Sequence, residues 1–266
     1  MKIRSAQDSD RDNVLIFCKD TFSWGDYIAD VWDKWKSKGG LYVLVDDGLV
    51  VGVYNIATFE RESWIEGMRV HPQYRKKGFG TKMLTHAESV IQNKIVRLII
   101  ESENRPSINL AESMGYGIEE KWRLYSTTPQ KQESDATIAT TSTKLYDIID
   151  SSTYADSWKW FSLDDTEIQK LVQQKRVIVS TEKGETSAVG IYNRSNDFAQ
   201  VFQLGFVNGT ADGMMEILKY VRNRAHELDC ERVQVFAQEK ISLEASFLDK
   251  KSLFYLMKKE LYQKNL

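Results

Sequence analysis

The spacing of apolar residues divides the first half of the chain into strands and helices. Apolar side chains recur at helical spacing and predict helices at residues 11–21, 27–36, 78–92 and 106–114. Short β-rich runs predict strands at residues 2–6, 41–45, 49–59, 64–70, 96–100 and 119–125. Asp46, Asp47 and Gly48 mark a tight hairpin between the second and third strands. This order predicts an α/β unit in which helices flank a central mixed β-sheet.

The pattern changes after residue 125. Residues 126–143 have the sequence STTPQKQESDATIATTST and contain almost no large apolar side chain. A polar segment rich in Ser and Thr is typical of a linker or a long surface loop. We therefore predict a first domain at residues 1–125, a linker at residues 126–143 and a second domain at residues 144–266.

The second half repeats the order of the first. It predicts strands at residues 144–149, 177–180, 187–193, 200–207 and 233–236, and helices at residues 166–173 and 214–228. The pentapeptide VGVYN at residues 51–55 also returns as VGIYN at residues 189–193. Because the pentapeptide and the order of elements both recur, we predict two units of one fold in tandem.

A basic loop with two glycines lies between the strand at residues 64–70 and the helix that follows. Its sequence is RKKGFG, residues 75–80. The first N–H groups of a helix have no partner within the helix, and the helix dipole favours an anion there. Gly78 and Gly80 allow the backbone to approach a ligand closely. The loop predicts a pyrophosphate site; the alternative is a solvated basic loop without a ligand.

The motifs narrow the choice of pyrophosphate. The loop lacks the GxxxxGK(S/T) pattern of nucleotide triphosphate sites and the GxGxxG pattern of dinucleotide sites. It resembles the acetyl-CoA motif of the GNAT N-acetyltransferases, (R/Q)xxGx(G/A), at Arg75, Gly78 and Gly80. A second motif of that family is matched at Asn104, Ser107, Ile108, Leu110, Gly115 and Tyr116. The resemblance implies two GNAT-like units and acetyl transfer from acetyl-CoA (CoA as product) to an amine.

The resemblance also implies where acetyl-CoA binds, in a V between the fourth and fifth strands. The backbone from Met68 to Val70 would bond the pantetheine arm, and N–H groups from Lys76 to Thr81 would hold the pyrophosphate. The residues assigned to the cofactor are Met68, Arg69, Val70, Arg75, Lys76, Lys77, Gly78, Phe79, Gly80, Thr81 and Asn104. The matching loop of the second half, residues 208–213, carries no basic residue and one acidic residue. We therefore expect the second unit to be a degenerate copy without the CoA loop.

Glu66 is the candidate general base that takes the proton of the acceptor amine. Strand alternation would place Glu66, Met68 and Val70 on one face, close to the amine. The alternative is a carboxylate paired with Arg69 or Arg97, and Glu101 and Glu103 are weaker candidates. No hydroxyl or thiol has an adjacent base, which favours direct attack over an acyl-enzyme.

The sequence does not identify the general acid that would protonate the departing CoA thiolate. The family often has a Tyr that protonates the departing thiolate, and Ala111 stands at that position. Tyr116 or Tyr125 could substitute, although packing is the expected role of both. A thiolate with a pKa of ~8.5 can also leave without full protonation.

The acceptor is the least defined part of the prediction. Asp26 and Tyr27, at the start of a helix, are candidate substrate-binding residues. Short motifs around them and around Glu66 resemble the histidine N-acetyltransferase branch, which implies the α-amine of a free amino acid. We therefore expect a small primary amine as acceptor. A protein lysine or N-terminal acetyltransferase and a non-catalytic acyl-CoA sensor are the alternatives.

Composition and charge limit the partners that the protein is expected to bind. The chain is 42% hydrophobic and 28% charged, with a net charge of −2, which favours neither nucleic acid nor a membrane as partner. We expect no transmembrane helix and no secretory signal. Two cysteines and three histidines show no metal-ligand spacing, so we predict no metal and a cytoplasmic protein with reduced thiols. We expect a monomer or a homodimer.

Overall fold

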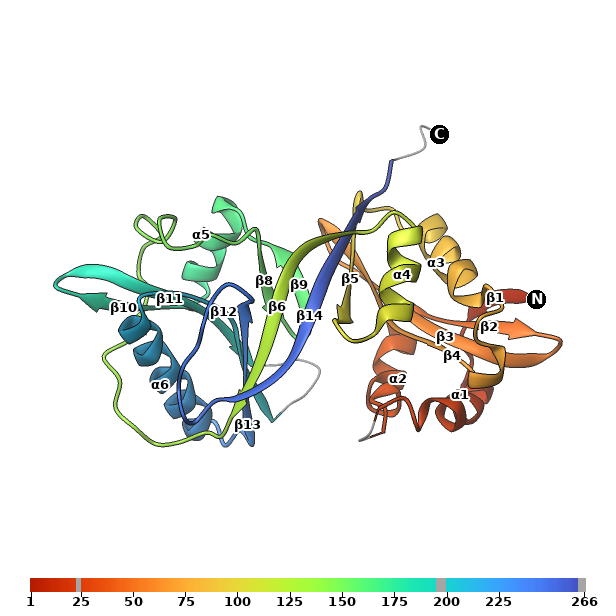
Figure 1. Cartoon of the computed structure of the whole chain (residues 1–266), viewed down its shortest axis with the longest axis horizontal. Coiled ribbons are helices and arrows are strands. Elements are labelled where there is room, and N and C mark those ends of the chain that lie inside the picture. The colour runs from red at the N-terminus through yellow and green to blue at the C-terminus, as the bar shows by residue number, and fades with distance from the viewer. Residues whose placement is uncertain (23–24, 195–199, 263–266) are drawn as a thin grey trace. The chain divides into compact units, whose positions relative to one another are not determined.

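Residues 1–22, 25–194 and 200–262, which the computed structural model describes, fall into two units (Figure 1). Unit 1 comprises Met1–Glu119 and Met257–Leu266, and unit 2 comprises Glu120–Leu256. The chain thus leaves unit 1 after Glu119 and returns to it near the C-terminus. The predicted bounds, at residues 1–125, 126–143 and 144–266, differ from this division at both crossings.

Unit 1 contains the elements predicted for the first half, with ends shifted by a few residues. They are β1 (Lys2–Ser5), α1 (Arg11–Cys18), α2 (Ile28–Ser37), β2 (Leu41–Asp46), β3 (Leu49–Thr58), β4 (Glu62–Val70), α3 (Phe79–Val90), β5 (Ile95–Glu101) and α4 (Arg105–Ser113). Two short 3-10 helices, η1 (Asp8–Asp10) and η2 (Pro72–Tyr74), precede α1 and α3. The predicted strand at residues 119–125 is part of β6 (Gly117–Thr127), which runs from unit 1 into unit 2.

The sheet of unit 1 is mixed. β1, β2, β3 and β4 are antiparallel neighbours, and β5 lies parallel to β4. Helices α1 and α2 cover one face, where Val53 is buried among their side chains. Helix α3 covers the other face (Figure 1). A Cβ at Gly52 would lie 2.8 Å from Met83 Sδ, so only glycine allows α3 this close to β3.

Unit 2 repeats this topology. Its elements are β7 (Thr137–Ile138), β8 (Thr153–Asp156), β9 (Lys159–Ser162), α5 (Asp165–Gln173), β10 (Val177–Glu182), β11 (Glu185–Arg194), β12 (Val201–Gly209), α6 (Ala211–Glu227), β13 (Arg232–Gln238) and most of β14 (Asp249–Glu260). β10, β11 and β12 are antiparallel neighbours, and β13 is parallel to β12. A Cβ at Gly190 would lie 2.7 Å from Ile217 of α6, as one at Gly52 would approach α3. The two copies of the pentapeptide are therefore structural equivalents.

Several expectations for the second half differ from the structure. Residues 128–135 lie along α6: Gln130 N donates to Arg222 O and Ser134 Oγ to Glu216 O, so their polar groups bind a helix. This segment is therefore not a free linker. The strand predicted at residues 144–149 is wrong, because Leu145 N and Ile148 N donate to carbonyls three residues earlier and form turns. Sequence patterns also did not predict the β8–β9 hairpin or β14.

No helix in the described ranges combines the length and the apolar character that crossing a membrane requires.

Candidate active site

Strands β4 and β5 pair over only part of their length. The parallel ladder joins Glu62, Ser63 and Trp64 to Ile95, Val96 and Arg97. β4 continues to Val70 and β5 to Glu101, but within the described residues the two have no further paired positions. The strands therefore separate after Trp64. This leaves backbone groups of the second half of β4 without a β5 partner, as the predicted V between the fourth and fifth strands requires.

A β-bulge at Gly67 and Met68 changes which side chains share a face. Asn55 pairs with Glu66 and Val53 pairs with Arg69, so Tyr54 lies opposite two residues of β4. Glu66 and Arg69 therefore lie on the face covered by α1 and α2. Val70 pairs with Gly52, which places it on the α3 face. The prediction that Glu66 and Val70 share a face is wrong, because simple alternation fails across a bulge.

Gly67 itself fits only glycine. Its φ is +62°, in the left-handed region, and a Cβ there would lie 2.5 Å from the Trp35 ring of α2. Trp35 and Trp32 are both buried, so this face of α2 forms core.

The basic loop leads into α3 without a side-chain cap. Gly78 is the N-cap residue, with φ +77°, and its helix has no side chain that accepts from the first N–H groups. In the described ranges, no hydrogen bond of good geometry is donated by the backbone N–H groups from Lys76 to Thr81. Arg75, Lys76 and Lys77 are exposed beside them. Six unsatisfied donors and three cations at the start of a helix are suited to a pyrophosphate.

Aromatic and polar contacts fix the loop. The Tyr74 and Phe79 rings stack with centroids 6.1 Å apart, and Lys77 Nζ lies 4.7 Å from the Tyr74 centroid. Arg75 Nε donates to Val70 O at 3.1 Å, which connects the loop to the end of β4. Gly80 has a different role, because a Cβ there would lie 2.8 Å from Leu110 Cδ2 of α4. This glycine lets α3 pack against α4.

Glu66 is half-buried and held from the neighbouring strand. Asn55 Nδ2 donates to Glu66 Oε1 at 2.8 Å, and Asn55 is itself buried. The two arginines considered as partners have other carboxylates. Arg97 binds Glu62 and Glu119, and Arg69 binds Asp26. The sequence analysis did not identify Asn55 as a site residue, although its recurrence as Asn193 in the second pentapeptide was a signal that could have done so.

Asp26 and Tyr27 meet Arg69 on the same face of the sheet. Arg69 Nε donates to Asp26 Oδ2 at 2.8 Å, and Asp26 Oδ1 accepts from Ile28 N at 3.0 Å. The guanidinium carbon of Arg69 lies 5.1 Å from the Phe22 centroid and 5.4 Å from the Tyr27 centroid. Burial raises the pKa of Tyr27 above its ordinary value, so its hydroxyl stays protonated at neutral pH. The structure thus places the Arg69 side chain beside the candidate substrate-binding residues, whereas the sequence assigned only the Arg69 backbone to the cofactor.

The remaining candidates divide between the units. Asn104 is the N-cap of α4, where its side chain accepts from Ser107 N. Tyr116 is buried in unit 1, and burial, followed by the charge of Glu88, raises the pKa of its hydroxyl. Tyr125 belongs to the core of unit 2.

Burial raises the pKa of the Cys18 thiol to about 12, with a smaller contribution from Asp26, so this thiol is not a ready nucleophile.

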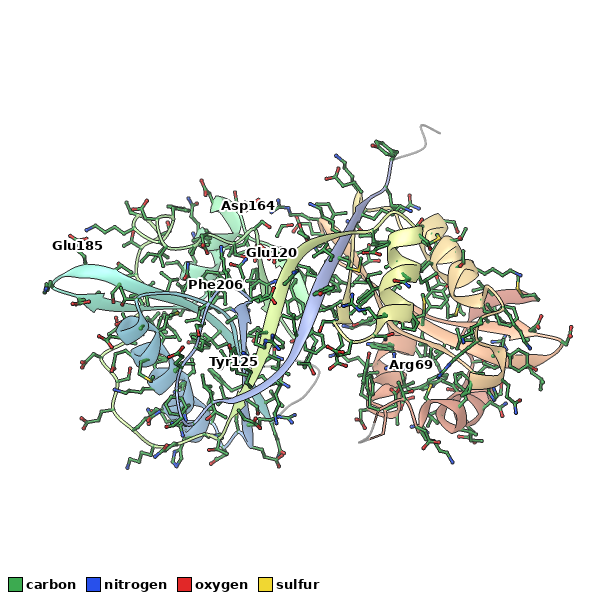
Figure 2. All side chains as sticks on the ribbon, viewed as in Figure 1. Arg69, Glu120, Tyr125, Asp164, Glu185 and Phe206 are labelled. Carbon is green, nitrogen blue, oxygen red and sulfur yellow. The ribbon has the colours of Figure 1, made fainter. Side chains whose placement is uncertain are left out.

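Unit 2 has neutral residues where unit 1 has charges. Asn193 pairs with Gln203 and Ile191 pairs with Phe206, the register positions that Glu66 and Arg69 hold in unit 1. Gln203 is fully buried, and its side chain accepts from Ser157 N and donates to Gln234. Figure 2 labels Phe206, which is likewise buried.

The rest of the corresponding site in unit 2 is also filled. The β8–β9 hairpin packs on β12, where a Cβ at Gly205 would lie 1.8 Å from Ala155 O. Glu120, also labelled in Figure 2, anchors the chain before this hairpin by accepting from Ser151 Oγ and Ser152 N. At the start of α6, Thr210 Oγ1 accepts from Gly213 N. Asp212 adds a negative charge there, so this helix start is poorly suited to an anion.

Comparison with known proteins agrees with this geometry. The sequence model of the acetyltransferase (GNAT) family matches residues 11–116. No match was found among curated protein sequences.

Solved structures match the chain over almost its full length. A candidate acetyltransferase from Thermoplasma acidophilum is 18% identical with a TM-score of 0.69, and the match covers 98% of this chain and 100% of that one. A GCN5-related N-acetyltransferase from Sphaerobacter thermophilus is 16% identical with a TM-score of 0.62, covering 97% and 95%. A tandem GNAT protein from the clavulanic acid biosynthesis pathway is 11% identical with a TM-score of 0.54, covering 97% and 98%.

At these identities the solved structures support the fold, and the family model supports the activity. Residues 11–116 therefore match the acetyltransferase (GNAT) family, and a second unit of the same topology follows them.

Proposed function

We propose that this protein transfers an acetyl group from acetyl-CoA to the primary amine of a small molecule, with the α-amine of a free amino acid as the leading candidate. Enzymes of the family use acetyl-CoA as co-substrate. The observation that carries the proposal is the row of unsatisfied N–H groups from Lys76 to Thr81, beside the point where β4 and β5 separate. Unit 2 lacks this feature, so we propose one acetyl-CoA site per chain.

The proposed cofactor site uses three parts of unit 1. The N–H groups from Lys76 to Thr81 bind the pyrophosphate, and the charges of Arg75, Lys76 and Lys77 complement it. The backbone from Met68 to Val70, which has no β5 partner, bonds the pantetheine arm along the edge of β4. Asn104 lies near that arm: its Oδ1 caps α4, and its amide nitrogen is left to donate. When bound, acetyl-CoA supplies the thioester carbonyl that the amine attacks.

Glu66 is the proposed general base. An amine must be neutral to attack, and reference amine pKa values are ~7.7–8.0 for an α-amine and ~10.4 for lysine. Asn55 holds the Glu66 carboxylate in place at 2.8 Å, and this carboxylate accepts the amine proton, directly or through water. The amine nitrogen then bonds to the acetyl carbon and the CoA thiolate leaves. The raised pKa of Cys18 supports direct attack, because this thiol stays protonated.

One observation favours a second candidate, a non-catalytic acyl-CoA sensor. The family's Tyr position holds Ala111, and both Tyr116 and Tyr125 are packed in cores. No tyrosine among those three positions can therefore protonate the thiolate. A thiolate with a pKa of ~8.5 leaves readily enough for catalysis without one, so we rank the enzyme first. A protein acetyltransferase ranks below both, since no observed feature favours a peptide acceptor.

The test has two steps. Calorimetric titration with acetyl-CoA should give one site per chain, and two sites would contradict a degenerate second unit. CoA release should then be measured with a panel of amines that contains amino acids, polyamines and a lysine peptide. Tight acetyl-CoA binding without turnover of any amine would favour the sensor, and no binding would overturn the proposal.

A further inference from the structure

Arg69 has one hydrogen-bond donor that its surroundings do not use. Its Nε donates to Asp26 Oδ2 at 2.8 Å and its Nη1 donates to Met68 O at 3.1 Å. Among the described residues, its Nη2 is buried and has no hydrogen-bond partner. A buried donor of a charged group without a partner costs free energy, so such groups are rare in folded proteins. This donor therefore indicates a place for an acceptor atom that the protein itself does not provide.

The guanidinium is held rigidly. The rings of Phe22 and Tyr27 lie 5.1 and 5.4 Å from its central carbon, and Asp26 fixes its Nε. Its side chain keeps 15% of its accessible surface, whereas Asp26 keeps 3%. The guanidinium is thus oriented in advance, which is typical of an arginine that binds a carboxylate.

Arg69 also lies near the proposed base. The bulge places Arg69 and Glu66 on one face of β4, opposite Val53 and Asn55, which are two residues apart on β3. Two residues of a strand span about 7 Å. Side chains from neighbouring positions on one face can bind the carboxylate and the amine that an α-amino acid carries on one carbon atom.

We propose that Arg69 binds the carboxylate of the acceptor, so that the acceptor is an α-amino acid with a free carboxyl group. This inference rests on the proposed function and names its substrate class. Arg69 acts as the specificity-determining residue, and Glu66 receives the amine proton. Figure 2 labels both Arg69 of unit 1 and Phe206, which holds the equivalent register position in unit 2. Phe206 offers no donor, in keeping with a unit that binds no acceptor.

The first experiment uses the native protein and therefore involves no risk of misfolding. CoA release is measured with a set of amino acids and with the matching amino acid amides, which keep the α-amine but lack the carboxylate. The expected kcat/KM for the acid exceeds that for the amide roughly 10- to 100-fold, the range of a charge-assisted hydrogen bond. Equal values for acid and amide would overturn the inference and leave the acetyltransferase proposal intact. No turnover of either, or of any other amine, would instead count against the proposed function.

A variant then assigns the preference to Arg69. Because Arg69→Gln alone would leave Asp26 as an unpaired buried charge, the double variant Arg69→Gln with Asp26→Asn is compared with Asp26→Asn alone. The double variant should lose the preference for the acid over the amide, with a ratio near one. If Arg69 only anchored Asp26, activity toward acid and amide would fall together and the ratio would persist. Thermal unfolding of each variant checks that the fold is retained.

Discussion

Asn55 and Asn193 hold the same position in the repeated pentapeptide, but they bind carboxylates from different elements. Asn55 Nδ2 donates to Glu66 of β4, which lies opposite it in the sheet. Asn193 Nδ2 donates to Asp156 at the end of β8, because its opposite residue on β12 is Gln203. In unit 2 the hairpin therefore supplies the carboxylate, and the asparagine contributes to packing. In unit 1 the carboxylate lies on the sheet itself, where a substrate could reach it.

Glu66→Gln should abolish most activity without weakening cofactor binding. The amide keeps an oxygen that can accept from Asn55 but cannot take a proton from the amine. We expect kcat to fall about 10²- to 10⁴-fold, the usual contribution of a general base. Steady-state kinetics measure kcat, and calorimetry with acetyl-CoA should give an unchanged Kd.

Glu103→Gln, at an exposed carboxylate after β5, serves as the matched control and should retain activity. Full activity of Glu66→Gln would assign the proton to another group.

Thr81→Asp should separate acetyl-CoA binding from stability. Thr81 is exposed in the first turn of α3, where a carboxylate interacts favourably with the helix dipole, by about 0.3–1 kcal/mol. The same charge would repel a pyrophosphate at the neighbouring N–H groups. We therefore expect acetyl-CoA affinity to fall at least tenfold while the melting temperature of the free protein stays equal or rises.

Thr85→Asp is the matched control, one helical turn further on and also exposed. It should bind acetyl-CoA nearly as well as the native protein. Equal loss of affinity in both variants would indicate a general charge effect, and no loss in Thr81→Asp would place the pyrophosphate elsewhere.

Gly67→Ala should destabilise the protein far more than Gly48→Ala. Both glycines have positive φ, +62° and +80°, but only at Gly67 would a Cβ clash, 2.5 Å from the Trp35 ring. The left-handed conformation costs about 1–2 kcal/mol at either site, and overpacking adds about 1–3 kcal/mol at Gly67. Urea unfolding measures both. Similar losses at the two sites would mean that α2 yields to the added methyl group.

Asp10 should make stability depend on pH in the acid range. The hydrogen bonds from Arg4, followed by other contacts, lower the pKa of this carboxyl below its ordinary value. A lowered pKa in the folded state stabilises the protein above the unfolded pKa of ~3.9, and this contribution is lost as pH falls below that value. Asp10→Asn should therefore be less stable than the native protein at pH 7.

The difference in unfolding free energy between the native protein and Asp10→Asn should become smaller as the pH falls from about 4 to 2. Urea unfolding at each pH measures this difference. A constant difference over that range would mean that Asp10 contributes through packing and not through its charge.

The sequence by itself determined the elements of unit 1, the repeat and the basic loop before α3 that we propose binds the cofactor. These features depend on local patterns: apolar spacing around α3, the glycines at the loop, and the pentapeptides of β3 and β11. Local sequence also indicated that the start of α6 is unsuited to an anion, because Asp212 and the absence of basic residues are visible in the chain. What such patterns cannot contain is the pairing of residues that are distant in sequence.

Only the tertiary structure decided which side chains meet. The bulge at Gly67 arises from the register of β3 against β4 and from the contact with Trp35, so it placed Arg69, and not Val70, beside Glu66. The ion pair of Arg69 with Asp26 joins residues 43 positions apart. The return of the chain to unit 1 after Leu256 and the attachment of residues 128–135 to α6 likewise rest on long-range hydrogen bonds, such as that from Leu261 N to Lys94 O. Hydrogen-bond partners far away in the sequence, and not a repeating apolar face, specify where these two segments lie. Apolar spacing therefore could not predict their positions.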